Sequence, residues 1–296
     1  MNKRIFLLVI SSLIGTADDG FSQQKVLRGA VLEPYFWIKS RNAGDNYYWE
    51  TLINNKEAKV PAKRHGGAAF NFNPSIVFDT TQDSLIVPLG IESKRRQTLF
   101  MVYKVKDSLK EQFLWTINDP EKIISAATNK RLVDLKKYSY QSYQEKIKPH
   151  KANIHFFQQN VTDSVAKLSS LIFGQKAKNE KLPPEEFKGS ISEILIYNRV
   201  LSGIETQKAA SYLAIKYGIS LSQFDNKNYI NSLGETIWNA EKHKGYTSSI
   251  TAVGRDDASG LLQLKSNNMI DEGLMSFELK SKSNTIPNNY FAFWSD

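Results

Sequence analysis

The residues that come nearest to a site of chemistry are Gly254, Arg255, Asp256, Asp257 and Gly260, in the stretch ITAVGRDDASGLLQLKS. Two adjacent carboxylates could transfer protons, or could bind Ca²⁺ together with turn carbonyls, because Ca²⁺ takes several oxygen ligands. The same residues could instead fix a turn between two strands. Asp side chains accept backbone N–H bonds, Arg can bind a carboxylate with two hydrogen bonds, and the two glycines permit unusual backbone angles. We expect the structural role, with calcium binding as the alternative and catalysis third.

Three adjacent aromatic residues, Tyr47, Tyr48 and Trp49, are the first candidates for binding a ligand. They fall in NAGDNYYWETLINNKEAK, which contains many turn-forming residues and which we interpret as a loop. An aromatic ring offers a flat apolar surface on which a sugar ring can stack, although one or two of the three should pack into the core. Asp79 and Asp83 flank an early turn and could add carboxylates to a calcium-dependent rim, or could only stabilise that turn.

The composition is that of a globular protein rich in β structure. The 296 residues are 41% hydrophobic and include 13 Tyr, 16 Phe and 5 Trp, which suit half-buried strands. The length allows one large or two ordinary domains. The sequence has no cysteine, which excludes disulfides, thiolate metal sites and cysteine nucleophiles. It also has no nucleophile elbow, no phosphate loop and no histidine pair at zinc-binding spacing.

The N-terminus has the pattern of a secretory signal peptide. Lys3 and Arg4 precede the apolar run IFLLVISSLI, which is too short to span a bilayer. Small residues flank Phe21, so we expect residues 1–22 to be removed; cleavage after Ala17 is the alternative, and a buried N-terminal helix is the competing interpretation. We therefore expect an exported protein, extracellular or on the outer cell surface, with no transmembrane segment after signal removal.

The charge distribution bears on the partner. The formal net charge is +9, and the excess lies in residues 25–221, because residues 222–296 contain seven basic and nine acidic residues. A basic extracellular domain favours anionic polymers, such as acidic glycans or lipopolysaccharide, through long-range attraction; a solvated lysine-rich surface is the alternative. Export argues against a nucleic-acid partner.

Apolar runs predict several strands, and residues 120–150 show no clear pattern. In QTLFMVYKVK the apolar residues on both faces indicate a strand that is covered on both sides. The other strands are expected in PYFWIKS, at both ends of PSIVFDTTQDSLIVPL, in QFLWTI and in ANIHFFQ.

One segment, residues 203–217, has apolar residues at helical spacing and should pack on a sheet. Ser202 and Glu205 form a capping box, in which each side chain bonds the other's free backbone N–H. Gly218 supplies the left-handed residue that ends such a helix.

The stretch around this helix resembles the end of a concanavalin A-like, laminin-G-type jelly roll found in bacterial surface proteins. The earlier pieces YFWIKS and NPSIVFDTTQDSL resemble the opening strands of that family, so the resemblance covers about residues 30–221. The residues that carry it at the C-terminal end are Phe187, Gly189, Ile191, Glu193, Ile194, Ile196, Tyr197, Arg199, Leu201, Ser202 and Glu205.

The resemblance also raises a test for enzymatic activity. Retaining glycoside hydrolases with this fold carry two glutamates on one strand, with an aspartate between them, so that two carboxyls face the cleft about 5 Å apart. The corresponding stretch, EILIYN, has only Glu193, with Leu195 and Asn198 in the places of the partners. This pattern argues against that mechanism.

Residues 229–266 resemble a small β domain that follows this jelly roll in large surface proteins of bacteria that use type IX secretion and often glide. No catalytic role accompanies the resemblance. The last strand, in NNYFAFWSD, has aromatic residues on both faces and no partner after it, and nothing resembles a type IX sorting domain. We therefore expect the second domain to be incomplete, in a chain that is part of a longer protein. The matching residues include Tyr229, Ser232, Gly234, Trp238, Tyr246, Ile250, Gly254, Arg255, Asp256, Asp257, Gly260, Leu261, Gln263 and Ser266.

The predicted fold is all-β, with a concanavalin A-like jelly-roll sandwich and one amphipathic helix at residues 25–221 and a partial second β domain at 222–296. The predicted function is non-enzymatic adhesion, by binding a glycan or another cell-surface polymer. A structural spacer in a larger surface protein is the second candidate, and a polysaccharide-active enzyme is the third. No cofactor is expected other than calcium, for which Asp256 and Asp257 are the candidate ligands.

The signal-peptide pattern gives a direct prediction. Protein isolated from its native host should begin at Gln23 or Gln24, because the small residues before this point suit a signal peptidase. N-terminal mass spectrometry measures this, and a native protein that retains Met1 would contradict the prediction.

Overall fold

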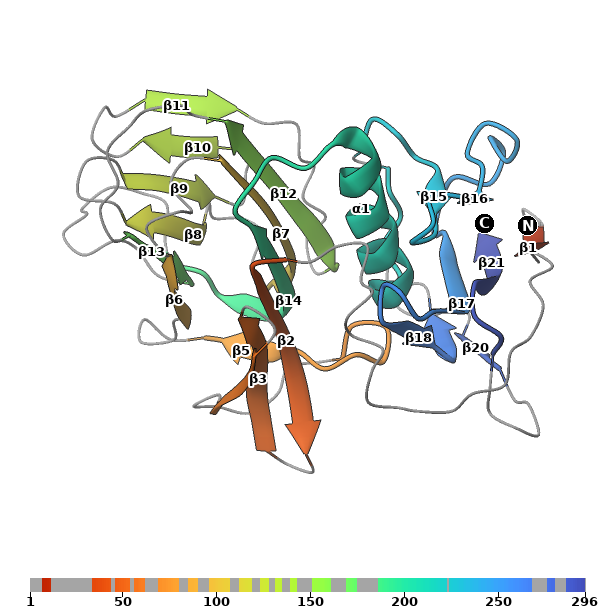
Figure 1. The fold of residues 1–296 in the computed structure, drawn as a ribbon, viewed down its shortest axis with the longest axis horizontal. Helices are drawn as coiled ribbons and strands as arrows, with labels where there is room; N and C mark the ends of the chain where they lie inside the picture. The colour runs from red at the N-terminus through yellow and green to blue at the C-terminus, as the bar shows by residue number, and fades with distance from the viewer. Residues whose placement is uncertain are drawn as a thin grey trace. The chain divides into compact units, whose positions relative to one another are not determined.

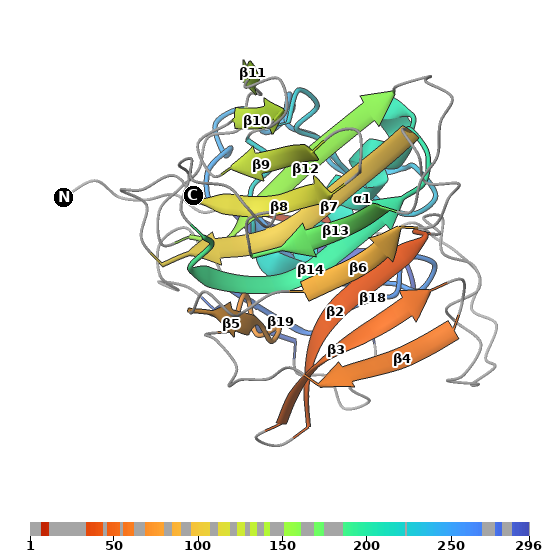
Figure 2. The same cartoon turned by 90° about the vertical axis from the view of Figure 1, so that its left-hand side faces the viewer.

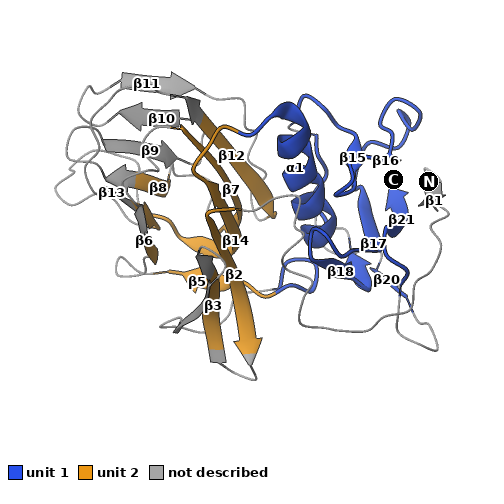
Figure 3. Ribbon diagram, viewed as in Figure 1, with its two compact units in different colours: residues 1–33, 69–73, 201–296 blue, residues 34–68, 74–200 orange. Residues whose placement is uncertain are grey.

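The computed structural model divides the chain into two compact units, coloured separately in Figure 3. The sandwich unit consists of residues 34–68 and 74–200, and the helix unit consists of residues 1–33, 69–73 and 201–296. The structure describes residues 7–11, 34–43, 46–53, 56–61, 69–79, 85–89, 96–106, 112–118, 123–127, 131–134, 139–142, 151–160, 169–174, 186–222, 224–267, 276–279 and 286–295.

The first layer of the sandwich unit is a seven-stranded antiparallel sheet. Its order is β12-β7-β14-β2-β3-β4, and β5 also pairs with β14. Figure 2 shows β2, β3 and β4 side by side in this order. The strands are β2 (Phe36–Ala43), β3 (Asn46–Ile53), β4 (Lys56–Pro61), β5 (Ile76–Phe78), β7 (Arg96–Val105), β12 (Asn153–Asn160) and β14 (Gly189–Tyr197).

The second layer is a six-stranded sheet in the order β11-β10-β9-β8-β13-β6 (Figure 1). Residues of both sheets join in one hydrophobic core, among them Phe36 and Met101 from the first sheet and Trp115 and Phe173 from the second. Two antiparallel sheets around a shared core make this unit a β-sandwich, which confirms the predicted class. The strands are β6 (Leu85–Leu89), β8 (Phe113–Asn118), β9 (Ile123–Ala127), β10 (Arg131–Asp134), β11 (Ser139–Ser142) and β13 (Ser169–Phe173).

Most strands predicted from apolar runs are present, and one predicted loop is wrong. β7 is buried on both faces from Gln97 to Tyr103, as its sequence indicates. The supposed loop at residues 42–59 instead contains β3 and most of β4, and β3 pairs in continuous register with β2 on one side and with β4 on the other. Its turn-forming residues are outweighed by its aromatic and β-branched side chains, which suit a sheet.

The helix unit contains α1 (Gly203–Tyr217), a four-stranded sheet and two short hairpins. The four-stranded sheet has the order β1-β21-β17-β18, and the hairpins are β15-β16 and β19-β20. The strands are β1 (Leu7–Ser11), β15 (Tyr229–Ile230), β16 (Thr236–Trp238), β17 (Thr251–Asp256), β18 (Leu261–Gln263), β19 (Lys265–Asn267), β20 (Ser276–Glu278) and β21 (Tyr290–Ser295).

The boundaries of α1 are those predicted from its capping residues. Ser202 and Glu205 form both bonds of the capping box, and Gly218 is left-handed with φ 62°. A Cβ at Gly218 would lie 2.5 Å from the backbone oxygen of Asn267, so glycine is needed here for close approach as well as for its backbone angle. Among the residues described, no helix is long and apolar enough to cross a membrane.

The helix belongs by its contacts to the unit that also contains the C-terminal strands. It packs against β15, β17 and β18, and the Ser211 hydroxyl accepts the backbone N–H of Ile230 at 3.0 Å. The buried hydroxyl of Tyr229 accepts the N–H of Leu221, and burial raises the pKa of this tyrosine. The sequence pattern places the helix with residues 25–221; whether 25–221 and 222–296 fold as separate domains stays a prediction.

The last strand, β21, was expected to lack a partner, and this expectation is wrong. It pairs with β17 on one side and with β1 on the other. The second partner comes from residues 7–11, inside the predicted signal peptide, so neighbouring sequence gives no sign of it. This segment is a strand here, not the buried helix considered as the alternative.

The short segment 69–73 leaves the sandwich sequence and joins the helix unit. Asn71 is fully buried, and its amide nitrogen donates to the backbone oxygens of Ile215 and Lys216 at 3.3 and 3.0 Å. Its amide oxygen accepts the N–H of Asn267 at 2.6 Å. Asn71 has φ 48°, a left-handed angle that Asn tolerates better than most residues. One side chain thus connects the end of α1 to β19.

The packing of α1 predicts the effect of truncating one side chain. Leu213→Ala should lower the free energy of unfolding by about 2–5 kcal/mol, because Leu213 is fully buried and its removal leaves a cavity. Ile204→Ala is the matched control: Ile204 is 52% exposed on the same helix, so its loss should change stability by less than about 0.5 kcal/mol. Urea unfolding measures both, and equal effects would contradict the packing.

Candidate functional site

The aromatic triplet is split between the two faces of β3. Successive side chains of a strand point to opposite faces. Trp49 is buried in the sandwich core, and Tyr47 packs against that core. Tyr48 therefore lies on the opposite face, where it is half-buried. Of the three predicted ligand-binding aromatics, only Tyr48 is placed to meet a ligand.

Tyr48 lies among charged residues on this opposite face of the sheet. Arg41 is its direct neighbour on β2, and Lys39 is opposite Glu50 in the same pairing. The Nε of Arg41 donates to Glu50 Oε2 at 2.8 Å. The two side chains remain 45% and 23% exposed, so both can still reach a ligand. We call Arg41, Tyr48 and Glu50 the open end of the polar face.

The other end of this face is buried. Trp37 Nε1 donates to a carboxylate oxygen of Glu193, and both residues are nearly or fully inaccessible. The Lys39 ammonium lies 3.6 Å from the centre of the Trp37 ring, in a cation–π contact. Lys39 is only 6% exposed. We call Trp37, Lys39 and Glu193 the buried end; its hydrogen bond joins β2 to β14 next to the open end, and its cation–π contact lies within β2.

The carboxylates of the polar face are poorly arranged for hydrolysing a glycosidic bond. Glu193, Lys39 and Glu50 form one row across three adjacent strands. Neighbouring strands are about 4.8 Å apart, so the two glutamates are about 9.6 Å apart at the backbone, with Lys39 between them. Glu193 is fully buried, and Glu50 is bound to Arg41. A pair of catalytic carboxyls needs an accessible acid and a free base or nucleophile, which this row does not offer.

Most of this face was not predicted from the sequence. Tyr48 was expected as a contact and Glu193 was considered as an acid, but Trp37, Lys39, Arg41 and Glu50 were not. The signal was present in FWIKSR and YYWE, where every second residue is charged or aromatic.

The proposed calcium rim is only partly described. Asp79 is exposed just after β5. Asp83 lies outside the described residues, so the rim stays a prediction.

Arg255 and Asp257 bind each other at the end of β17. The Nε and Nη2 of Arg255 donate to the two carboxylate oxygens of Asp257 at 2.6 and 2.8 Å. These hydrogen bonds raise the pKa of Arg255 above its usual value. Arg255 also donates to the backbone oxygen of Ile286, and Asp257 N–H donates to Asn288. The pair thus connects β17 to the segment that leads into β21.

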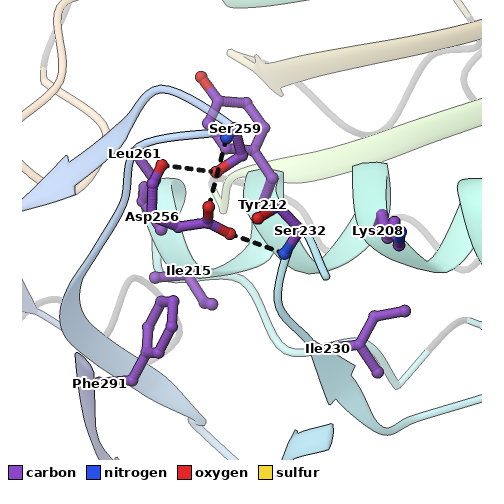
Figure 4. Close-up of a pocket in the computed structure, with 9 residues that line it drawn as sticks. All are labelled: Lys208, Tyr212, Ile215, Ile230, Ser232, Asp256, Ser259, Leu261 and Phe291. Atoms are coloured by element: carbon purple, nitrogen blue, oxygen red, sulfur yellow. Dashed lines mark hydrogen bonds between the residues drawn. The ribbon is translucent and has the colours of Figure 1, made fainter. Parts of the chain in front are cut away.

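Asp256 has a different environment from its neighbour, as Figure 4 shows. It is 3% exposed, and its two carboxylate oxygens accept backbone N–H bonds from Ser232 at 2.7 Å and Ser259 at 3.3 Å. The Ser259 hydroxyl donates to the Asp256 backbone oxygen at 3.1 Å. One carboxylate therefore connects β17 to the loop after β15 and closes its own turn.

The two glycines of the cluster have different roles. Gly260 has φ 68°, a left-handed angle that favours glycine. Gly254 does not share this angle, contrary to the expectation that both glycines relieve the backbone. A Cβ at Gly254 would lie 2.4 Å from the Phe291 ring and 2.8 Å from the backbone oxygen of Tyr290. Gly254 is needed because β21 passes too closely for any side chain.

These contacts leave little for a calcium ion to bind. Both oxygens of Asp257 already face a guanidinium, whose charge would repel a cation, and both oxygens of Asp256 accept backbone N–H bonds. Within the described ranges, no group of three or more His, Cys, Asp or Glu residues is placed to hold a metal ion.

A small hollow lies beside Asp256 (Figure 4). Its walls include Lys208, Tyr212 and Ile215 of α1, together with Phe291. It has room for about one water molecule, too little for a sugar. The buried hydroxyl of Ser232, which also lines it, has no hydrogen-bond partner in the protein. A water molecule suits this place better than any larger ligand.

One family model matches part of the chain. Residues 205–296 match a domain of unknown function, DUF8202. This range begins inside α1 and lies wholly within the helix unit. No curated protein matches the sequence. The resemblance to laminin-G-type jelly rolls, and the type IX context it implies, stay predictions.

Among solved structures, those of Trypanosoma rangeli sialidase show a weak likeness. The complex with sialic acid has a TM-score of 0.38 and 13% identity, and the complex with the inhibitor DANA has 0.37 and 12%. Each match covers 57% of this chain, and this chain spans 31% of the sialidase. A likeness at this level tells nothing about activity or ligand.

Because Asp256 and Asp257 have different environments, replacing each should lower the free energy of unfolding by a different amount. Asp256→Ala should lower the free energy of unfolding by about 2–4 kcal/mol, because it leaves two buried backbone N–H groups without their acceptor. Asp257→Ala should cost about 1 kcal/mol, because its ion pair is partly exposed to solvent.

Urea unfolding of both variants, with and without calcium, tests this order. Calcium should leave the unfolding midpoint of the unsubstituted protein unchanged. A calcium-dependent midpoint that either substitution abolishes would restore the metal-site interpretation.

Proposed function

We propose that this protein is a non-enzymatic, exported binding module that attaches to a glycan or another cell-surface polymer through the open end of the polar face. The observation that carries the proposal is the position of Tyr48, half-buried at the open end of the polar face beside the partly exposed Arg41–Glu50 pair. A phenol ring can stack on the apolar face of a sugar, while the guanidinium and the carboxylate bond its hydroxyls.

The construction of the sheet supports binding rather than chemistry. Arg41 and Tyr48 are adjacent on paired strands, and the Trp37–Glu193 hydrogen bond joins β2 to β14 on the same face, which limits the motion of the strand that carries Arg41. Rigid contact groups lose little conformational freedom when a ligand binds. The basic residues of 25–221 add attraction for anionic polymers. A spacer in a larger surface protein is the second candidate. It is favoured by the buried end of the polar face, where Trp37, Lys39 and Glu193 already contact one another.

A glycan array decides between these functions. Tyr48→Ala should weaken binding by about tenfold, the loss expected for one aromatic stacking contact of about 1.4 kcal/mol. Tyr48→Trp should retain binding, because a larger ring still stacks. The matched control is Tyr47→Ala, the neighbouring tyrosine on the core side, which should reduce stability but not the affinity of the folded protein.

Three results would contradict the proposal. Binding to no glycan or anionic polymer would favour the spacer. An equal loss of affinity in Tyr47→Ala and Tyr48→Ala would place the ligand elsewhere. Release of reducing ends from a polysaccharide would show an enzyme.

A further inference from the structure

The strand β21 lies between two partners of different origin. β17, on one side, belongs to the same C-terminal segment, and pairs with it from Thr251 to Arg255. β1, on the other side, comes from the opposite end of the chain and pairs over five residues. The outer edge of β21 is thus paired with a strand from the other end of the chain.

The side chains of β21 also pack against residues outside β1. The Phe293 ring lies 5.5 Å from both Tyr229 and Trp238, and the Trp294 ring lies 4.2 Å from Phe277. Gly254 lets β17 approach β21 closely. A strand anchored in this way presents a fixed row of backbone N–H and C=O groups along its outer edge, and such an edge pairs readily with another strand.

The segment that fills this edge is uncharged and apolar, with the sequence LLVIS. It lies within the run that has the pattern of a signal peptide, and removal of residues 1–22 on export would take it away. The edge of β21 would then lose the strand that pairs with it here.

We propose that the outer edge of β21 is a strand-accepting site. Its occupant is an uncharged, apolar, extended segment of about five residues from a partner protein, which adds antiparallel to the sheet as β1 does in the unprocessed chain. Backbone hydrogen bonds supply the affinity of such strand addition, and alternate side chains supply the specificity.

Introduced cysteine pairs in the full chain test whether β1 pairs with the outer edge of β21. The sequence has no other cysteine, so any disulfide must join the two introduced residues. Ile10 is directly opposite Ala292, so Ile10→Cys with Ala292→Cys should form a disulfide under mild oxidation. Val9→Cys with Ala292→Cys is the control: it is one residue out of register and should react at least about tenfold more slowly. Equal rates, or no disulfide in the first pair, would overturn the proposal.

A synthetic peptide tests the occupant. In the full chain, Val9→Pro with Ile10→Pro should release β1, because two adjacent prolines remove an N–H from whichever side faces β21. With Ala292→Cys added, this variant should capture a lysine-tailed peptide of residues 3–13, carrying cysteine in place of Ile10, about tenfold faster than a scrambled peptide does. The same chain without the prolines should capture it slowly, since its own strand fills the edge.

Two outcomes would overturn the assignment of a partner strand. Equal capture of the scrambled peptide would show non-specific association. Disulfide-linked dimers through Ala292→Cys, formed faster than peptide capture, would show that a second copy fills the edge. Circular dichroism checks that the proline variant is folded; if it is unfolded, the disulfide rates of the two intramolecular cysteine pairs decide whether the edge accepts a strand.

Discussion

The hydrogen bonds of Asn71 are the contact on which the helix unit most depends. The last carbonyls of a helix have no partner within it, and burial makes an unpaired carbonyl costly. Asn71 meets two of them, Asn73 donates to the Lys216 oxygen at 2.8 Å, and Asn71 also accepts the N–H of Asn267. Gly218 is required at the same place, because any side chain would meet the Asn267 oxygen. These contacts therefore join the end of α1, the strand β19 and the segment 69–73 at one place.

In the sandwich unit, the alternation of side chains along each strand determines both the core and the polar face. The rule that directs Phe36 and Ile38 into the core directs Trp37 and Lys39 to the opposite face. The core and the candidate binding face are thus two sides of the same strands. A shift of one residue between β2 and β3 would bury Tyr48 and expose Trp49, so core packing also fixes what a ligand meets.

Local patterns in the sequence predicted local structure well. Ser202, Glu205 and Gly218 gave α1 its boundaries, because capping depends on residues within one turn. The same reasoning failed for Tyr47 to Trp49, since turn residues on either side concealed a strand whose partners lie elsewhere. Asp256 and Asp257 are indistinguishable in sequence, yet one is buried under backbone N–H groups and the other binds Arg255. The role of Asn71 depends on partners 144 to 196 residues away, which no local pattern reveals.

The position of segment 69–73 in the sequence affects how the helix unit folds. During synthesis Asn71 leaves the ribosome well before α1 exists, and its partners arrive only after residues 74–200 have followed. Closing so long a loop is slow compared with forming a hairpin. The family match to residues 205–296 does not include this segment. A gene fragment restricted to that match would encode α1 without the side-chain amides that bind the Ile215 and Lys216 oxygens. The C-terminal region made alone would leave these two carbonyls to water or to another donor.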